Sequence, residues 1–130
     1  MGALVCYSVT DIESSQAVGK WIDAVREISG PICSIVLVGL KSDVPHEKRQ
    51  VTTSQGHQMA IEHGVTFFEV SSNNDTNVKE TMDALAHLMN KEYDSIFVGS
   101  ILGGISLRSR VLIDKGRTWR EESDGAGFKL

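Results

Sequence analysis

The feature that most constrains this chain is the alternation of apolar strand-length runs with helical stripes over its first ninety residues. The runs are Ala3 to Val9, Ile32 to Gly39 and Val65 to Val70. Each is followed by a segment whose apolar residues recur at three- and four-residue steps, as on one face of a helix. The resulting βαβαβα order predicts an α/β fold with three parallel strands, because parallel neighbours need a crossover connection.

Capping residues and glycines set the expected helix ends. Thr10 and Asp11 are good N-caps for a first helix that Gly30 ends, and Thr53 is expected to cap a second helix that ends at Gly64. The first and third helices carry the apolar stripes Val18, Trp21, Ile22, Val25, Ile28 and Val78, Met82, Leu85, Ala86, Met89. Right-handed crossovers place the first two helices on one sheet face and the third on the other, which predicts a doubly wound arrangement.

Charge divides the 130 residues unevenly. Residues 1–90 carry 6 basic and 11 acidic groups, whereas residues 91–130 carry 7 and 6. The change coincides with a loss of clean periodicity, so we predict a domain over 1–91 and an atypical tail over 92–130. The formal net charge of −4 argues against non-specific nucleic-acid binding, which needs clustered Lys and Arg.

The cysteines and the hydropathy of the sequence predict the cellular location of the protein. Cys6 and Cys33 lie in apolar runs and are predicted to be reduced core residues of a cytoplasmic protein. No apolar run approaches the roughly 20 residues of a membrane span. The first residues lack the pattern of a signal peptide.

Ligand sites of parallel sheets lie at the carboxyl ends of the strands. Three loops are expected there: Ser8 to Asp11, Leu40 to Asp43, and Ser71 to Asn73. Any chemistry of this chain is therefore predicted to reside in these loops. The four His residues share no short metal-ligand spacing.

Two of these loops resemble nucleotide-binding motifs. Leu40-Lys41-Ser42-Asp43 resembles the Asn-Lys-x-Asp guanine-recognition motif of small GTPases, and Glu69-Val70-Ser71-Ser72-Asn73 resembles their Glu-x-Ser-Ala-Lys motif. Further segments are similar to Rab GTPases in order and spacing: Gly2 to Thr10, Lys48 to Val51, His63 to Glu69, and Thr76 to Val78. The resemblance covers residues 1–91 and implies a Ras-like, P-loop NTPase-type fold. It also implies GTP or GDP as ligand and a role in vesicle traffic.

The resemblance assigns guanine contacts to individual residues. Asp43 would accept hydrogen bonds from guanine N1–H and the exocyclic amine, a task that suits a carboxylate because it offers acceptors and no donor. Lys41 would lay its aliphatic stem over the base. The backbone N–H of Ser72 could donate to guanine O6, and Ser71 would brace the loop around Asp43. Without the resemblance, Lys41 and Asp43 would be interpreted as part of a solvated loop.

Two departures weaken the expected base site. Leu40 replaces the motif Asn, whose amide ties the loop to the base and to the phosphate loop, and Asn73 replaces a Lys that stacks near the base. Both changes remove contacts without an evident replacement.

The resemblance extends only to the last three of the family's six strands. The motif G-x-x-x-x-G-K-[ST] does not occur in the 130 residues, so the expected P-loop, both switch regions, the Mg²⁺ site and the catalytic Gln are missing from them. Phosphoryl transfer depends on these parts. We therefore expect no catalytic residue and no hydrolysis by this chain alone, with guanine nucleotide bound weakly or not at all.

The alternative hypothesis is a non-enzymatic interaction fragment. In the family the strand Ala3 to Val9 is central, so here it would become an apolar edge that could pair with a complementing chain, or with Rab regulators or effectors. The tail residues Ile96 to Val98 and 105–114 predict an added hairpin over the exposed sheet, or else a disordered extension. No Cys follows Cys33, so no prenyl anchor is expected. A third alternative is a product that never accumulates in folded form.

Overall fold

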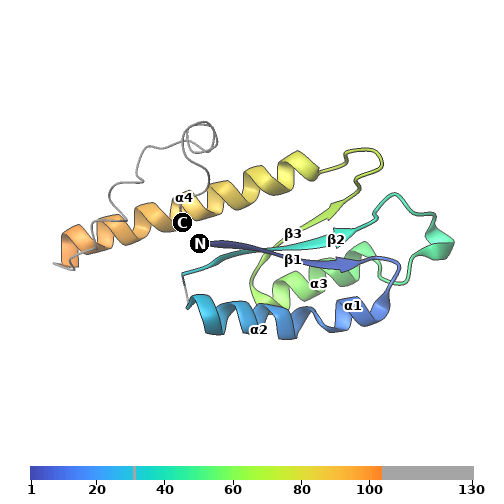
Figure 1. The fold of residues 1–130 in the computed structure, drawn as a ribbon, viewed down its shortest axis with the longest axis horizontal. Coiled ribbons are helices and arrows are strands. Elements are labelled where there is room, and N and C mark those ends of the chain that lie inside the picture. Colours follow the sequence, from blue (N-terminus) through green and yellow to red (C-terminus); the bar gives the residue numbers. More distant parts are fainter. Residues whose placement is uncertain (31, 104–130) are drawn as a thin grey trace, which may run out of the picture. The chain divides into compact units, whose positions relative to one another are not determined.

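The computed structural model describes residues 1–30 and 32–103 and contains a three-stranded parallel sheet in the order β1-β2-β3 (Figure 1). The chain divides into two compact units, Met1–Tyr93 and Asp94–Leu130, and the sheet belongs to the first. In chain order the elements are β1 (Gly2–Ser8), α1 (Ile12–Gln16), α2 (Val18–Ser29), β2 (Ser34–Leu40), the 3₁₀ turn η1 (His46–Lys48), α3 (Thr53–His63), β3 (Thr66–Val70) and α4 (Val78–Gly103). The predicted α/β class and the parallel sheet are confirmed.

Helices cover both faces of the sheet, as the crossover rule predicts (Figure 1). The helices α1, α2 and α3 lie on one face, where the larger core gathers, and the part of α4 that belongs to the first unit lies on the other. The larger core consists of Val5, Tyr7, Val9, Val18, Ile22, Ile35, Leu37, Val51 and Ala60. The smaller core consists of Val36, Val38 and Val70, with Phe68, Leu85 and Leu88 packed against it. Because β2 is central, its residues are buried on both faces from Ser34 to Gly39, which explains its continuous apolar sequence.

Side chains cap the helices close to where the sequence predicts. The Asp11 carboxylate accepts from the backbone N–H groups of Glu13 and Ser14 and so starts α1. The first predicted helix is divided at Ala17, which ends α1 and precedes α2. The α3 helix is capped by Thr52 instead of the predicted Thr53, in a reciprocal capping box with Gln55.

Glycines end two helices as predicted. Gly30 follows α2 and Gly64 follows α3, and both have positive φ, at 73° and 63°. An L side chain rarely adopts this backbone conformation, so glycine is favoured at both positions.

Two further predictions are wrong. Cys6 is exposed instead of buried, because it alternates with buried residues on the outermost strand. Ile96 to Val98 lie in α4 and not in a strand, since the helix continues to Gly103. The remainder of the proposed hairpin, 105–114, lies outside the described residues. The boundary at Lys91–Glu92 falls within α4 and stays a prediction.

Both predicted apolar stripes are only partly covered. On α2, Val18 and Ile22 are buried, whereas Trp21 and Ile28 are 62% and 85% exposed. On α4, Val78 and Met82 are also exposed. The buried residues of α2 therefore pack against the sheet. Both α2 and α4 also expose apolar side chains to solvent.

Candidate functional site

The loops after β2 and β3 meet at the carboxyl end of the sheet. The backbone N–H of Ser42 donates to the carbonyl of Val70 over 3.1 Å, which joins the first loop to the end of β3. Lys41 adopts a left-handed backbone with φ of 66°, and its carbonyl accepts from Val44 N–H over 3.2 Å. This tight turn carries the chain from Leu40 back to Asp43.

Asp43 is the point at which the two loops are joined by side chains. The Ser71 hydroxyl donates to Asp43 Oδ1 over 2.6 Å, and the Asn73 amide donates to Asp43 Oδ2 over 2.8 Å. The Ser71 hydroxyl also accepts from the backbone N–H of Asn73 over 3.2 Å. Asn73 therefore makes a contact that the sequence did not predict for it. A carboxylate has about four lone-pair positions, so Asp43 retains acceptor capacity for a further donor.

These hydrogen bonds favour the ionised form of the Asp43 carboxyl group. Donation by the Ser71 hydroxyl and then by the Asn73 amide lowers the pKa of the Asp43 carboxyl below its ordinary value. The group is therefore ionised at neutral pH. An exposed carboxylate that is ionised at neutral pH can receive two N–H donors from one edge of a purine.

The predicted site residues differ in exposure. Ser71 is buried, with 1% of its surface exposed, and serves as a support. Lys41, Asp43, Ser72 and Asn73 are exposed and can reach a ligand, and Leu40 presents a partly exposed apolar side chain at the end of β2. The structure thus brings Asp43, Ser71 and Asn73 into direct contact through hydrogen bonds.

The polar groups of the third predicted loop, Ser8 to Asp11, are used in hydrogen bonds within the chain. The Ser8 and Thr10 hydroxyls hydrogen-bond to each other over 2.8 Å, and Asp11 is used as the cap of α1. The Val9 carbonyl accepts from the N–H groups of Gln50 and Val51. This loop therefore positions the neighbouring segment and contributes no free charged group.

Sequence reasoning missed an ion pair beneath the site. Arg49 donates to both carboxylate oxygens of Glu69 over 2.8 Å, and the Thr53 hydroxyl donates to the same carboxylate over 3.1 Å. The pair raises the pKa of Arg49. The signal in the sequence is Glu69, the one charged residue inside the strand β3. The Glu69 carbonyl accepts from the Asn77 amide, which ties the loop before α4 to the same strand.

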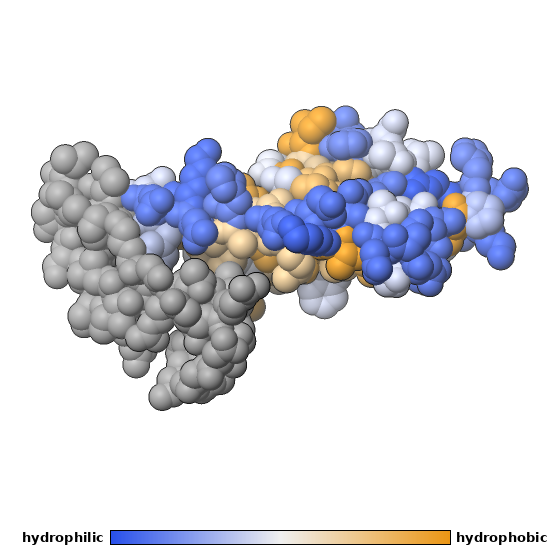
Figure 2. All heavy atoms as spheres, turned by 90° about the horizontal axis from the view of Figure 1, so that it is seen from above, coloured by the Kyte–Doolittle hydropathy of each residue, from blue (hydrophilic) through white to orange (hydrophobic). Residues whose placement is uncertain are grey.

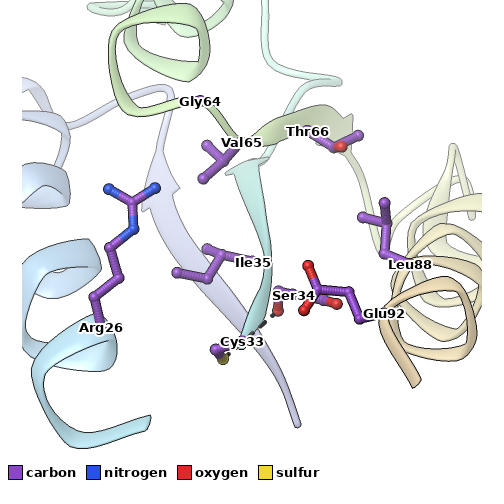
Figure 3. Close-up of a pocket in the computed structure, with 9 residues that line it drawn as sticks. All are labelled: Arg26, Cys33, Ser34, Ile35, Gly64, Val65, Thr66, Leu88 and Glu92. Carbon is purple, nitrogen blue, oxygen red and sulfur yellow. Dashed lines mark hydrogen bonds between the residues drawn. The ribbon is translucent and has the colours of Figure 1, made fainter. Parts of the chain in front are cut away.

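A separate cavity of about 130 Å³ lies at the opposite, amino end of β2 and β3 (Figure 3). Arg26, Cys33, Ser34 and Glu92 are among its lining residues. Figure 3 shows Glu92 and Ser34 on one side of β2, and Arg26 on the other. The loops of the candidate site do not contribute to this cavity.

In the part of the chain that the structure describes, no group of three or more His, Cys, Asp or Glu side chains could hold a metal ion. No helix in that part has both the length and the hydropathy needed to cross a membrane.

Comparison with known proteins shows to which family the chain is similar. The Ras family model matches residues 1–91. The chain is 39% identical over 95 residues to the Ras-related protein SEC4 of Saccharomyces cerevisiae, which covers 73% of this chain and 43% of SEC4. It is 36% identical over 86 residues to the Ras-related protein RAB1BV of Beta vulgaris, and 37% identical over 84 residues to the Ras-related protein RabQ of Dictyostelium discoideum. These matches cover 66% and 65% of this chain, and 40% and 41% of the relatives.

A parallel sheet with its polar loops at the carboxyl end, matched by the family model over 1–91, defines the class: the chain belongs to the Ras family. Within that family it fits the Rab-type small GTPases, since its relatives carry Rab names. The chain spans about two fifths of the length of these relatives.

Proposed function

We propose that this chain is a portion of a Rab-type small GTPase that retains a weakened guanine-base site centred on Asp43. The observation that supports the proposal is the pair of hydrogen bonds by which Ser71 and Asn73 hold the Asp43 carboxylate at the carboxyl end of the sheet. In this proposal Lys41 covers the base, and the Ser72 N–H donates to guanine O6.

The proposed affinity is low because the base alone supplies the binding energy. A hydrogen bond to a charged group contributes roughly 1.5–3 kcal/mol. Association costs at least about 4 kcal/mol in lost freedom, which offsets much of the gain from several such hydrogen bonds. A dissociation constant of about 1 mM, or about −4 kcal/mol, is therefore the tightest binding that we expect.

Hydrolysis of GTP is not proposed for these 130 residues alone. The P-loop motif does not occur in them. Without backbone N–H groups and a Lys around the phosphates, and without Mg²⁺, the transition-state charge has no stabilising partner. A role in vesicle traffic and a cytoplasmic location, together with guanine nucleotide, regulators and effectors as partners, are proposed from membership of the family.

The test compares four ligands by NMR chemical-shift titration: GMP, GDP, GTP and IMP. IMP lacks the exocyclic amine that Asp43 would accept from, so it should bind several-fold more weakly than GMP. GMP, GDP and GTP should bind equally, because the proposed contacts do not involve phosphate. A dissociation constant for GDP below about 1 μM would contradict the proposal.

Two variants locate the site. Asp43→Ala should abolish the preference for GMP over IMP, whereas Asp83→Ala, an exposed acidic residue on α4, should leave it unchanged. Leu40→Asn should tighten GMP binding if the base site is formed. An unaltered GMP affinity in both Asp43→Ala and Leu40→Asn would exclude Asp43 as the ligand.

A second candidate function is supported by the position of β1. It is an outermost strand of the described sheet, and its sequence holds no charge and no Pro. Such an edge favours pairing with another chain. We propose a non-enzymatic interaction fragment as the alternative, docking through this edge and through the exposed side chains of α2 and α4. No nucleotide binding together with a stable complex with a regulator, an effector or a complementing chain would favour it.

A further inference from the structure

The cavity at the amino end of β2 is present because β2 begins before it has β3 as a neighbour. Ser34 and Ile35 precede Val36, the first residue of β2 that pairs with β3. The connection from α3 to β3 turns back to its own helix instead, since the Val65 N–H donates to the Ala60 carbonyl over 2.9 Å. Residues of α2, β2, β3 and α4 line the cavity of about 130 Å³, and none of its described lining residues belongs to β1.

One buried polar group in the wall of this cavity has no partner. Ser34 is 5% exposed, and its hydroxyl makes no hydrogen bond with any described residue. The alternate residues that follow it on β2, Val36 and Val38, belong to the smaller apolar core. A buried hydroxyl without a partner is unfavourable. The cavity therefore favours a ligand that hydrogen-bonds to Ser34.

The second polar group is the carboxylate of Glu92 on α4. Figure 3 shows its side chain extending from the helix toward Ser34. Glu92 is half-buried, and within residues 1–30 and 32–103 its side chain has no hydrogen bond or salt bridge. Arg26 also lines the cavity, but it lies on the other side of β2 and donates to the His63 carbonyl. A partly desolvated carboxylate without a partner favours a cationic ligand.

The walls beside these two polar groups are apolar. Leu88 lies one turn before Glu92 on α4, and Val65 also lines the cavity. Figure 2 shows hydrophobic residues on the outer surface too, gathered in the middle of one face with hydrophilic residues around them. A hydrophobic surface alone binds apolar groups whatever their charge. The cavity differs because it joins apolar walls to one carboxylate and one hydroxyl.

We propose that this cavity binds a primary ammonium group carried on a short aliphatic chain. An ammonium has three N–H donors, which suit the Glu92 carboxylate and the Ser34 hydroxyl oxygen, while the aliphatic chain packs against Leu88 and Val65. A cavity of about 150 Å³ holds benzene, so this one accepts a chain of about four carbons with its ammonium. The inference does not depend on the proposed nucleotide site, whose loops lie at the opposite end of the sheet.

Such a group is supplied either by a free aliphatic amine or by a lysine side chain of another protein. Both present the same ammonium on the same four-carbon chain. n-Butylamine represents the first source, and lysine with both backbone ends capped represents the second. Capped lysine within about threefold of n-butylamine in affinity assigns a protein lysine, whereas weaker binding of capped lysine assigns free amines, because the peptide part is then excluded.

The test is an NMR titration of the full chain at pH 7, where an alkylamine is protonated. The probes n-butylamine, 1-butanol and butyrate share an apolar chain and differ in the polar end. n-Butylamine should shift the amides of Ser34, Val65 and Leu88 with a dissociation constant of about 1–10 mM. It should bind at least about fivefold more tightly than 1-butanol. A smaller preference, or tighter binding of butyrate, would overturn the proposal. Shifts that do not saturate below about 100 mM would also overturn it, because water alone would then occupy the cavity.

Two variants on α4 locate the carboxylate. Glu92→Gln keeps the shape and removes the charge, so it should weaken n-butylamine at least about fivefold and leave 1-butanol unchanged. Glu80→Gln makes the same change of charge at an exposed position of the same helix, and it should leave both affinities unchanged. An equal effect of the two variants would indicate attraction by net charge alone and would contradict the site. Circular dichroism checks that both are folded, and the titration of the unmodified chain with the three probes decides if Glu92→Gln is not.

Discussion

Arg49 and Glu69 form a two-pronged ion pair beneath the candidate site, with both N–H···O distances at 2.8 Å. Their side chains are only 13% and 15% exposed. Arg49 lies in the connection between β2 and α3, and Glu69 lies in β3. Because Gln50 and Val51 then bond to the Val9 carbonyl, the pair helps to hold the carboxyl ends of all three strands in register.

Removing one partner of this pair should destabilise the fold strongly. Arg49→Ala leaves the Glu69 carboxylate largely buried with only Thr53 as side-chain donor, and should lower the free energy of unfolding by about 3 kcal/mol. Urea denaturation followed by circular dichroism measures this change. The matched control is Lys79→Ala, since Lys79 and Asp83 form a 2.7 Å pair with side chains 84% and 64% exposed. That variant should change stability by less than about 0.5 kcal/mol, and an equal effect of both variants would contradict the argument.

The sequence predicts most of the fold because its signals are local. The unbroken apolar run of β2 indicates a strand covered on both faces, and Asp11, Gly30 and Gly64 mark helix ends through their own backbone and side-chain chemistry. The Arg49–Glu69 pair escapes such reasoning, since residues 20 positions apart meet only through the fold. The contact between Ser71 and Asp43 was expected from family resemblance, not from periodicity.

The failed predictions share a physical cause. Cys6 has the apolar neighbours of a core residue, but the burial of a strand face depends on which element lies across from it. Ile96 to Val98 have strand-forming side chains, yet they continue a helix that begins at Val78. In both cases tertiary context outweighs local propensity.

Gly56 should tolerate no larger residue. A Cβ at this buried position of α3 would overlap Phe67 Cζ and lie 2.5 Å from Tyr7 Oη, closer than non-bonded atoms approach. Gly56→Ala should therefore destabilise the chain by about 1–3 kcal/mol, although alanine is the better helix former. Thermal unfolding measures the effect. Ser54→Ala, at an exposed position on the same helix, should be neutral or slightly stabilising, and a stabilising Gly56→Ala would show that α3 is free to shift.

Tyr7 should make stability fall at alkaline pH. Its hydroxyl is buried and has no hydrogen-bond partner among the described residues, and burial, together with the Glu69 carboxylate, raises the pKa of Tyr7 to about 12. The fold therefore favours the neutral phenol. This contribution is complete below the unfolded pKa near 10 and is lost as the pH rises toward 12. Tyr7→Phe should leave stability at pH 7 within about 0.5 kcal/mol. In denaturation at pH 7 to 11, the variant should lose less stability than the parent, and parallel curves would contradict this account.

Asp43 should titrate at lower pH than an unperturbed aspartate, because the Ser71 hydroxyl and the Asn73 amide both donate to its ionised form. The contribution of this group to stability is therefore present above the unfolded pKa of about 3.9, and it is lost as the pH falls through the lower folded value. Side-chain carboxyl shifts measured by NMR between pH 2 and 6 report the titration directly. Ser71→Ala removes the 2.6 Å donor and should raise the pKa of Asp43. Thr76→Ala alters a neighbouring hydroxyl that bonds Asn74 instead, so it should leave that pKa unchanged. If Ser71→Ala and Thr76→Ala gave the same Asp43 titration curve, the two loops would not be joined through this carboxylate in solution, and the base site built on it would lose its support.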